Sequence, residues 1–417
     1  MKFSQGKALR TLCLAAVVVL TTFGAHANVI VEWNARAEAI AVKKKMLPPP
    51  NARGMAMLHI AMFEAVNAVE RRYSSYRLNL TTARNVSKEA AAATAAHAVL
   101  TALHPDEQEA VNAALLASLA GVPDGPAKVA GVALGKKAAA EVLAMRAKDG
   151  ATAPESYRPQ TVAGVYVPTV VPAGSTFGRV TPWFMSSGSQ FRPAPPPALS
   201  SATWARDVNE IRDFGGRAKS KRSAEQTAIG QFWFVTGPQA WNPIARQLVT
   251  IKKLDIVDSA RLFALVAIAT NDAFIAVFDA KYHYNLWRPI TAIRNADLSD
   301  NPATQRDATW LPLGDTPMHP EYPCAHCITS AAAATVLQSA FGNDIPEVSM
   351  TSITAPGVTR RWTRLQDYSD EVALARIYGG FHYRFSNVAA QEMGRKIAEL
   401  AVNTQLRAPN ASAAPSR

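Results

Sequence analysis

The chain has 417 residues, 48% of them hydrophobic, and its 44 Lys and Arg residues against 32 Asp and Glu residues give a formal net charge of +12. That length is enough for one large or two medium domains. The basic balance suits an anionic ligand or surface, but no basic-aromatic stripe or known nucleic-acid motif accompanies it, so we expect no nucleic-acid partner.

The first 27 residues have the pattern of a secretory signal peptide. Three basic residues lie within the first ten positions, a short apolar run covers residues 12–23, and Ala25-His26-Ala27 provides small residues at positions −3 and −1 of a cleavage site. We expect cleavage after Ala27 and a secreted or periplasmic protein.

The remaining chain, residues 28–417, is expected to contain no membrane span. Its most apolar stretch, residues 262–278, is interrupted by Asn271-Asp272, whereas a spanning helix requires about 18 uncharged apolar residues. Only Cys324 and Cys327 follow the signal, which excludes a disulfide-rich scaffold.

Alanine-rich segments with Leu, Val and Met at helical spacing dominate the sequence, so we predict a mostly helical, all-α chain. In the N-terminal half, residues 28–150, the predicted helices are 31–45, 53–73, 89–103, 107–119 and 126–148. Pro48-Pro49-Pro50 is expected to stop the first of them.

Residues 151–201 differ from the rest because they are rich in Pro, Gly and Ser and carry several aromatic side chains. A long loop of this kind is more often functional cover than linker, so we predict an ordered crossover between two helical halves. In the second half, residues 202–407, the predicted helices are 202–214, 223–233, 259–284, 324–341, 368–378 and 387–402. The small, polar tail 408–417 is expected to be disordered.

The last third of the chain carries basic residues in a pattern suited to one tetrahedral oxyanion. They fall in three blocks: Lys281 with Arg288-Pro289, then Pro323-Cys324-Ala325-His326, then Arg376 with His382. Arg presents a rigid fork of donors to paired oxygens, and Lys supplies a movable point charge. A proline as first helical residue would aim the free amides of its helix at the same anion. Two imidazoles can divide ligation or attack and proton transfer, so the pattern predicts activation or transfer of a phosphate-like group.

This pattern is similar to that of the type 2 phosphatidic acid phosphatase superfamily, which includes bacterial acid phosphatases and vanadium-dependent haloperoxidases. The superfamily shows Lys-x6-Arg-Pro, then Pro-Ser-Gly-His, then Ser-Arg-x5-His-x3-Asp, and the three blocks occur here in order between Lys281 and Ser386. The resemblance implies two helical bundles joined by the Pro-rich crossover, with the anion site in the C-terminal half.

The resemblance also implies the roles of the site residues. His382 would bond the vanadium of bound vanadate, or attack phosphorus in a phosphatase, and His326 would be the acid-base group near the apical oxygen. The residues that would bind the oxyanion are Lys281, Arg288, Cys324, Ala325 (through its backbone amide) and Arg376.

Four positions depart from the superfamily pattern. They are Cys324 for Ser, Ala325 for Gly, Ala375 for Ser and Ser386 for Asp. A thiol is a weaker donor than a hydroxyl, and a thiolate would repel the anion.

The loss of the Asp leaves His382 without its usual carboxylate. Ser386 lies one helical turn later and can hydrogen-bond the imidazole, but it carries no charge. Losing such a carboxylate costs about 10–100-fold in affinity or activity at metal-type sites. Asp367, Asp370 and Glu371 are the candidates to replace it.

Cys324 and Cys327 are expected in the first turn of a helix, where their side chains can meet in an oxidising compartment. A disulfide would remove Cys324 as a donor. A zinc site formed with His326 is the alternative, but one of its three ligands would point the wrong way along the helix.

His319 lies seven residues before His326. In bromide-oxidising haloperoxidases a His occupies the matching place, and a chloride-oxidising relative has Phe, so the resemblance favours bromide or iodide over chloride. The alternative is an ordinary histidine of a surface loop.

We therefore expect a secreted vanadium-dependent haloperoxidase-like enzyme that binds vanadate and uses hydrogen peroxide to oxidise a halide. Lys281 would polarise the peroxide and His326 would move protons. The first alternative is a periplasmic acid phosphatase that cleaves a phosphomonoester through a phospho-His382 intermediate, although such phosphatases are compact single bundles. The second is a non-catalytic phosphate- or vanadate-binding protein. The organic acceptor and the oligomeric state are left open.

Overall fold

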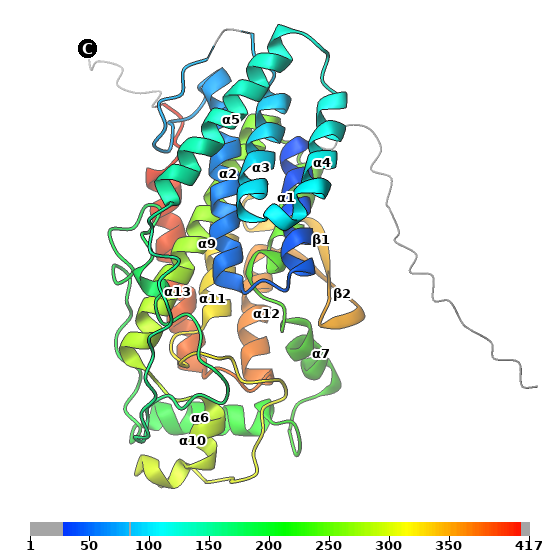
Figure 1. The fold of residues 1–417 in the computed structure, drawn as a ribbon. Coiled ribbons are helices and arrows are strands. Elements are labelled where there is room, and N and C mark those ends of the chain that lie inside the picture. Colours follow the sequence, from blue (N-terminus) through cyan, green and yellow to red (C-terminus); the bar gives the residue numbers. More distant parts are fainter. Residues whose placement is uncertain (1–27, 83–84, 410–417) are drawn as a thin grey trace, which may run out of the picture.

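The structure is a computed structural model that describes residues 28–82 and 85–409. The predicted signal peptide, residues 1–27, and residues 410–417 of the predicted tail lie outside these ranges. The described chain is mostly helical, which confirms the all-α prediction (Figure 1). In the described part the strands form one antiparallel pair, β1 (Asp344–Ser352) and β2 (Ala355–Arg364), which the sequence pattern does not predict.

The N-terminal half forms a bundle of near-parallel helices at one end of the molecule (Figure 1). Its helices are α1 (Val29–Lys43), α2 (Pro48–Glu70), α3 (Lys88–Leu103), α4 (Gln108–Ala120) and α5 (Pro126–Arg146). The prediction that α2 begins near residue 53 is wrong, because the three prolines at 48–50 form its first turn. A proline there loses no intrahelical hydrogen bond, and its fixed φ suits the helix start.

The C-terminal half packs against this bundle and forms the other end of the molecule (Figure 1). Its helices are α6 (Ala202–Gly215), α7 (Ala224–Phe232), α8 (Asn242–Ile251), α9 (Ile256–Tyr284), α10 (Pro289–Arg294), α11 (Ala325–Phe341), α12 (Leu365–Tyr378) and α13 (Arg384–Thr404). The short helices α8 and α10 and the β-hairpin are not predicted. The hairpin gives little periodic signal because β2 buries only Ala355 and Trp362.

Helix α9 is the central element, between α2 on one side and α11 and α13 on the other (Figure 1). By length and composition it is apolar enough to cross a membrane, but 94% of its most apolar window is buried inside the protein. It is therefore a core helix. Helices α11 and α13 approach so closely at Gly394 that a β-carbon there would overlap the carbonyl of Ile328.

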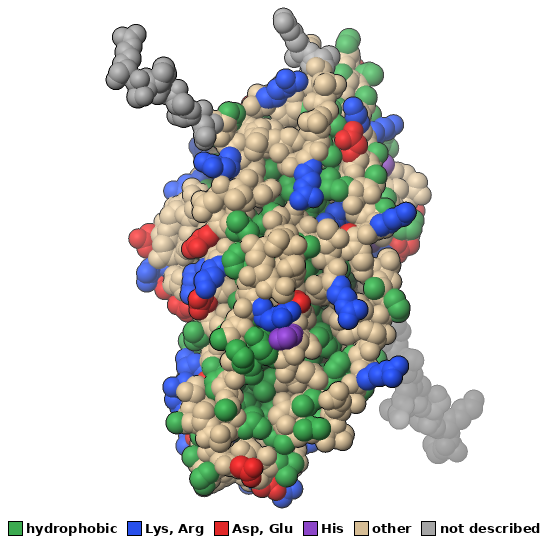
Figure 2. Space-filling model, turned by 90° about the vertical axis from the view of Figure 1, so that its left-hand side faces the viewer, with side chains coloured by type: hydrophobic (Ala, Val, Ile, Leu, Met, Phe, Trp, Pro, Cys, Tyr) green, Lys and Arg blue, Asp and Glu red, His purple; other side chains and the backbone are tan. Residues whose placement is uncertain are grey.

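The crossover, residues 151–201, runs along one side of the molecule without an α-helix (Figure 1). Figure 2 shows that side, where Lys and Arg side chains lie scattered among apolar and acidic ones. Polar residues of α9 fix the crossover in place. Asp272 accepts hydrogen bonds from the backbone amides of Trp183 (2.7 Å) and Met185 (3.1 Å), and Asp279 forms a two-pronged ion pair with Arg192 (2.9 and 3.0 Å).

A buried histidine joins the two halves. His59 of α2 stacks on Phe263 of α9 with 5.1 Å between ring centroids, and its Nε2 lies 2.9 Å from the side-chain nitrogen of Asn34. Burial, and to a smaller extent the charge of Arg246, lowers the pKa of His59 to about 3. The imidazole is therefore neutral in the folded protein at neutral pH.

This pKa predicts an acid-sensitive contribution to stability. A folded-state pKa below the unfolded value of 6.5 stabilises the fold fully above pH 6.5, and the contribution is lost as the pH falls toward 3. His59→Gln should therefore reduce the fall in the free energy of unfolding between pH 7 and pH 5 by roughly 2 kcal/mol. Urea unfolding of both proteins at the two pH values measures this difference, and parallel pH dependences would contradict it.

Candidate active site

The ends of five helices converge in the C-terminal half and bring the three predicted blocks together. The contributions are Lys281 from the last turn of α9, Arg288 as N-cap of α10, His326 from the first turn of α11, Arg376 from the last turn of α12 and His382 from the α12–α13 turn. Gly380, with φ of +80°, allows the chain to reverse in that turn. Helix ends are suitable places for such side chains because their free backbone groups add polarity.

Lys281 is buried and donates hydrogen bonds to the backbone carbonyls of Pro320 and Glu321, both at 2.9 Å. Burial lowers the pKa of its ammonium well below the usual value, and the nearby charge of Arg288 lowers it further. Lys281 therefore ties the loop before α11 to the end of α9.

Arg288 is also buried and connects two loops. Its Nε donates to the carbonyl of His319 (2.8 Å) and its Nη2 to Nδ1 of the same residue (2.9 Å). Its Nη1 donates to the carbonyl of Phe381 (2.9 Å) and to Nε2 of His382 (3.2 Å). Burial lowers the pKa of the guanidinium to about 10, while the carboxylate of Glu321 acts in the opposite direction.

Arg376 has spare donors. Its Nη1 donates to the carbonyl of Trp233 (2.7 Å), and the guanidinium lies over the ring of Phe381 at 4.6 Å from the centroid. Its Nε has no hydrogen-bond partner among the described residues, and neither has Nε2 of His326. Burial and the Arg288 charge lower the pKa of Arg376 to about 9. Two unpartnered polar atoms beside a cavity indicate a place for a ligand.

His382 is held by Glu321, for which the sequence pattern predicts no role. Its Nδ1 lies 2.9 Å from Oε1 of Glu321, which also accepts from the amide of Tyr383 at 3.0 Å. Because Nε2 accepts from Arg288, the proton of the neutral imidazole is on Nδ1 and points at Glu321. Burial raises the pKa of Glu321 to about 7, against the opposing charges of Arg288 and Lys281.

The predicted sources of a partner for His382 are wrong. The Ser386 hydroxyl has no hydrogen-bond partner among the described residues, although it lies near enough to Glu321 to lower the pKa of that carboxyl. The three acidic candidates bond elsewhere: Glu371 to Trp233, Asp370 to Gln391 and Asp367 to Arg364. The sequence feature that could have identified Glu321 is its position, because it is an acidic residue two positions before Pro323 in an otherwise basic block.

Cys324 and Cys327 form a disulfide, with their α-carbons 5.4 Å apart. Cys324 is the N-cap of α11 and its Sγ accepts a hydrogen bond from the amide of Cys327 (3.2 Å), so Pro323 precedes the cap and is not the first helical residue. A disulfide sulfur has no proton, so the predicted donation from Cys324 to an anion is absent in this structure. The amide of Ala325, in the first turn, has no partner within its helix. Among the described residues no cluster of three or more His, Cys, Asp or Glu side chains is placed to hold a metal ion, so zinc gains no support.

His319 is not an ordinary surface-loop histidine. It accepts from Arg288 through Nδ1 and packs edge-on against Phe278, with 5.1 Å between ring centroids. Burial, followed by the charges of Lys281 and Arg288, lowers its pKa well below the usual value. His319 therefore fixes Arg288 and forms part of the cavity wall.

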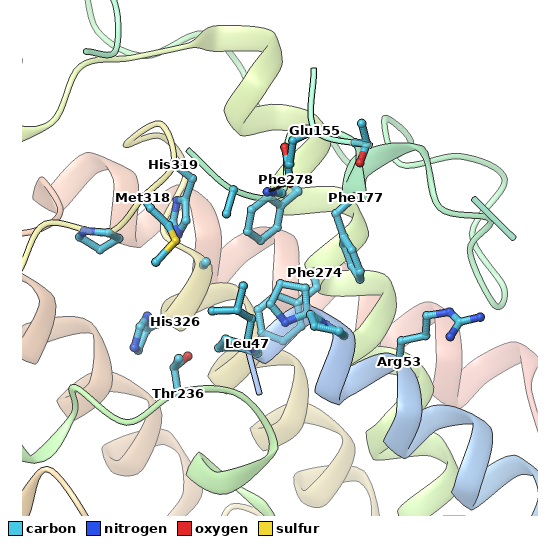
Figure 3. A pocket seen from close by; sticks show the side chains of 18 of the residues that line it. Leu47, Arg53, Glu155, Phe177, Thr236, Phe274, Phe278, Met318, His319 and His326 are labelled. Atoms are coloured by element: carbon cyan, nitrogen blue, oxygen red, sulfur yellow. Dashed lines mark hydrogen bonds between the residues drawn. The ribbon is translucent and has the colours of Figure 1, made fainter. Parts of the chain in front are cut away.

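A cavity of about 630 Å³ leads to this group of residues (Figure 3). His319, Ala325, His326 and Arg376 line its polar end. Lys281, Arg288 and His382 are connected to that end through His319 and Glu321 by the bonds described above.

The arrangement fits a tetrahedral oxyanion such as vanadate or phosphate. Three buried cations supply the charge, and Arg376 and the start of α11 supply free donors. The lone pair on Nε2 of His382 accepts from Arg288 in this structure, and it could bond a central atom if that hydrogen bond were released. A bound anion would stabilise these buried like charges, because it offsets their mutual repulsion.

Three comparisons agree on the kind of protein this chain resembles. Residues 261–410 match the family model described as the VCPO second helical-bundle domain. The chain is 26% identical over 288 residues to the vanadium chloroperoxidase of Curvularia inaequalis, and this match covers 52% of the chain and 46% of that enzyme. The chain thus spans about half the length of the curated relative.

Two solved structures extend the likeness to nearly the whole chain. A bacterial vanadium-dependent iodoperoxidase has a TM-score of 0.80 and 25% identity, over 92% of this chain and 98% of that one. The holo form of a bacterial vanadium-dependent chloroperoxidase has a TM-score of 0.69 and 17% identity, over 85% of this chain and 92% of that one. The second likeness shows the fold alone.

The contact between Glu321 and His382 leads to a prediction about oxyanion affinity. Glu321→Ala removes the acceptor that orients the imidazole and should weaken orthovanadate binding by about 10–100-fold. Glu321→Gln keeps an acceptor oxygen and should recover most of this loss. Isothermal titration calorimetry with orthovanadate measures both variants.

Ser386→Ala is the matched control, because the Ser386 hydroxyl does not bond His382. Its affinity should fall by less than that of Glu321→Ala. A greater loss for Ser386→Ala than for Glu321→Ala would contradict the assignment of Glu321 as the positioning residue.

Proposed function

We propose that this chain, which belongs to the superfamily of vanadium-dependent haloperoxidases and type 2 phosphatidic acid phosphatases, is itself a vanadium-dependent haloperoxidase. Its reaction would be the oxidation of iodide or bromide by hydrogen peroxide. The observation that carries the proposal is the buried group of Lys281, Arg288 and Arg376 around a neutral His382 whose Nδ1 proton points at Glu321. The likeness to an iodoperoxidase over almost the full chain supports it.

Vanadate, when bound, would supply a Lewis-acidic centre that activates peroxide while the oxidation state of vanadium is unchanged. Lys281, Arg288 and Arg376 would neutralise the charge on its oxygens, and the free amide of Ala325 would add a donor at the start of α11. Nε2 of His382 would bond the metal, in the tautomer that Glu321 fixes.

His326 would transfer protons at the polar end of the cavity. Its Nε2 has no partner among the described residues, and burial, then the charge of Arg376, lowers its pKa well below the usual value. A bound trianion would oppose the repulsion from the neighbouring cations and raise this pKa toward neutrality. An imidazole that titrates near the working pH is suited to exchange protons with peroxide and product.

We propose further that the protein is exported after cleavage behind Ala27. The disulfide between Cys324 and Cys327 supports export, because such bonds persist in oxidising compartments and are rare in the cytosol.

The proposed reaction is tested by a paired assay on the signal-free protein. One arm follows triiodide formation from iodide and peroxide with and without orthovanadate, and the other follows hydrolysis of p-nitrophenyl phosphate by the apoprotein. We expect vanadate-dependent triiodide formation that falls by at least about 100-fold in His382→Ala, because the ligand to the reacting centre is lost. His97→Ala, on α3 of the N-terminal bundle, is the matched control and should retain activity.

Either of two other outcomes would overturn the proposal. Phosphate release by the apoprotein, inhibited by vanadate, would identify a phosphatase working through His382. Vanadate binding without activity in either arm would identify a non-catalytic oxyanion-binding protein.

The halide preference is a separate prediction that depends on His319. Because His319 lines the cavity and bonds Arg288, we expect the order iodide, bromide, chloride, with chloride at least about 10-fold slower than bromide, a barrier difference of about 1.4 kcal/mol. Initial rates of peroxide consumption at equal halide concentrations measure the order. Chloride oxidation as fast as bromide oxidation would contradict it.

A further inference from the structure

The cavity beside the oxyanion site is much larger than the inorganic reactants require. Its volume is about 630 Å³, whereas a water molecule occupies about 30 Å³ in the liquid. Peroxide and a halide ion would fill only a small part of it. Sites for organic ligands in proteins have volumes of about 300–1,000 Å³.

Away from the oxyanion end the cavity wall is apolar and aromatic. Figure 3 shows the rings of Phe177 and Phe274 across the cavity from His326, with the ring of Phe278 between them and His319. Phe177 packs edge-on against Phe278 with 5.9 Å between ring centroids, so the wall is itself well packed. A hydrated halide ion gains no favourable contact from such an apolar surface, whereas the flat face of an aromatic molecule can pack against it.

Two charged side chains of this wall, Arg53 and Glu155, are engaged by the protein itself, and a third, Asp315, is exposed. Arg53 donates through Nε to Asp149 (2.7 Å), and its guanidinium points away from the rings (Figure 3). Glu155 accepts from the backbone amides of Gly174 and Ser175. Because Arg53 and Glu155 are paired within the protein and Asp315 is exposed, the aromatic part of the wall favours a neutral occupant.

Three separate parts of the chain build the wall. Residues 47–53 come from the start of α2 in the N-terminal bundle, residues 151–177 from the crossover, and Phe274 and Phe278 from α9. The oxyanion site itself uses only residues of the C-terminal half. The N-terminal bundle and the crossover therefore contribute to the cavity but not to the oxyanion site.

We propose that this cavity binds a neutral, electron-rich aromatic acceptor, such as a phenol, and that the acceptor is halogenated there. This inference rests on the proposed haloperoxidase function. Peroxide, halide and one proton give hypohalous acid and water. The hypohalous acid then transfers its halogen, without the bonding electron pair, to a ring carbon, which loses its proton, and the oxygen leaves as water.

The test separates halide oxidation from acceptor binding. Leu47 lines the cavity at the start of α2 and is 47% exposed, so Leu47→Trp should narrow the cavity without disturbing the core. Leu116→Trp, at a 71% exposed position on α4, is the matched control. Each protein is assayed for triiodide formation without acceptor and for iodination of 2-naphthol.

We expect Leu47→Trp to lower kcat/KM for 2-naphthol about 10-fold or more, as steric changes in apolar pockets do, with triiodide formation within about twofold of the parent protein. Leu116→Trp should change neither rate. Calorimetry without peroxide should show 2-naphthol binding to the parent protein and weaker binding to Leu47→Trp.

Equal fractional changes of the two rates in every variant, together with no calorimetric binding of 2-naphthol, would overturn the inference and indicate that free hypohalous acid reacts outside the protein. Failure of the proposed function is distinguishable from this result, because it removes triiodide formation in the parent protein itself.

Discussion

Three cationic side chains, Lys281, Arg288 and Arg376, lie almost completely out of contact with solvent in one region of the protein. Removing a single charge from water costs several kcal/mol, and neighbouring charges of the same sign add to the cost. The fold offsets it with backbone carbonyls of Trp233, of residues 319–321 and of Phe381, and with the carboxylate of Glu321. The positive charge that remains uncompensated favours the binding of an anion in this region.

Helix α9 connects this site to the rest of the molecule. Its C-terminal end supplies Lys281, while Asn271, Asp272 and Asp279 along its length hold the crossover by side-chain bonds. The crossover and the start of α2 then form the apolar wall in front of the oxyanion site. One helix thus sets the position of both the polar end and the apolar part of the cavity.

The departures from the superfamily pattern have structural counterparts. Glu321, from the loop before α11, orients His382 in place of the missing Asp, and its carboxylate shares the charge of Lys281 and Arg288. The Cys324–Cys327 disulfide caps α11 but provides no proton, so the donor that the superfamily obtains from Ser is not replaced there. An oxyanion bound at this site would therefore depend more heavily on Arg376 and on the free amides of α11.

The sequence by itself determined the helical class of the chain, the approximate bounds of its long helices and the identity of the basic residues and histidines of the site. These follow from local periodicity and from fixed spacings such as that between Lys281 and Arg288. The tertiary structure alone decided that Glu321, and not Ser386 or an acidic residue of α12, bonds His382, because that contact joins residues 61 positions apart. It also decided that the prolines at 48–50 start α2 and that residues 47–53 reach the cavity, since packing of distant segments leaves no periodic signal in the chain.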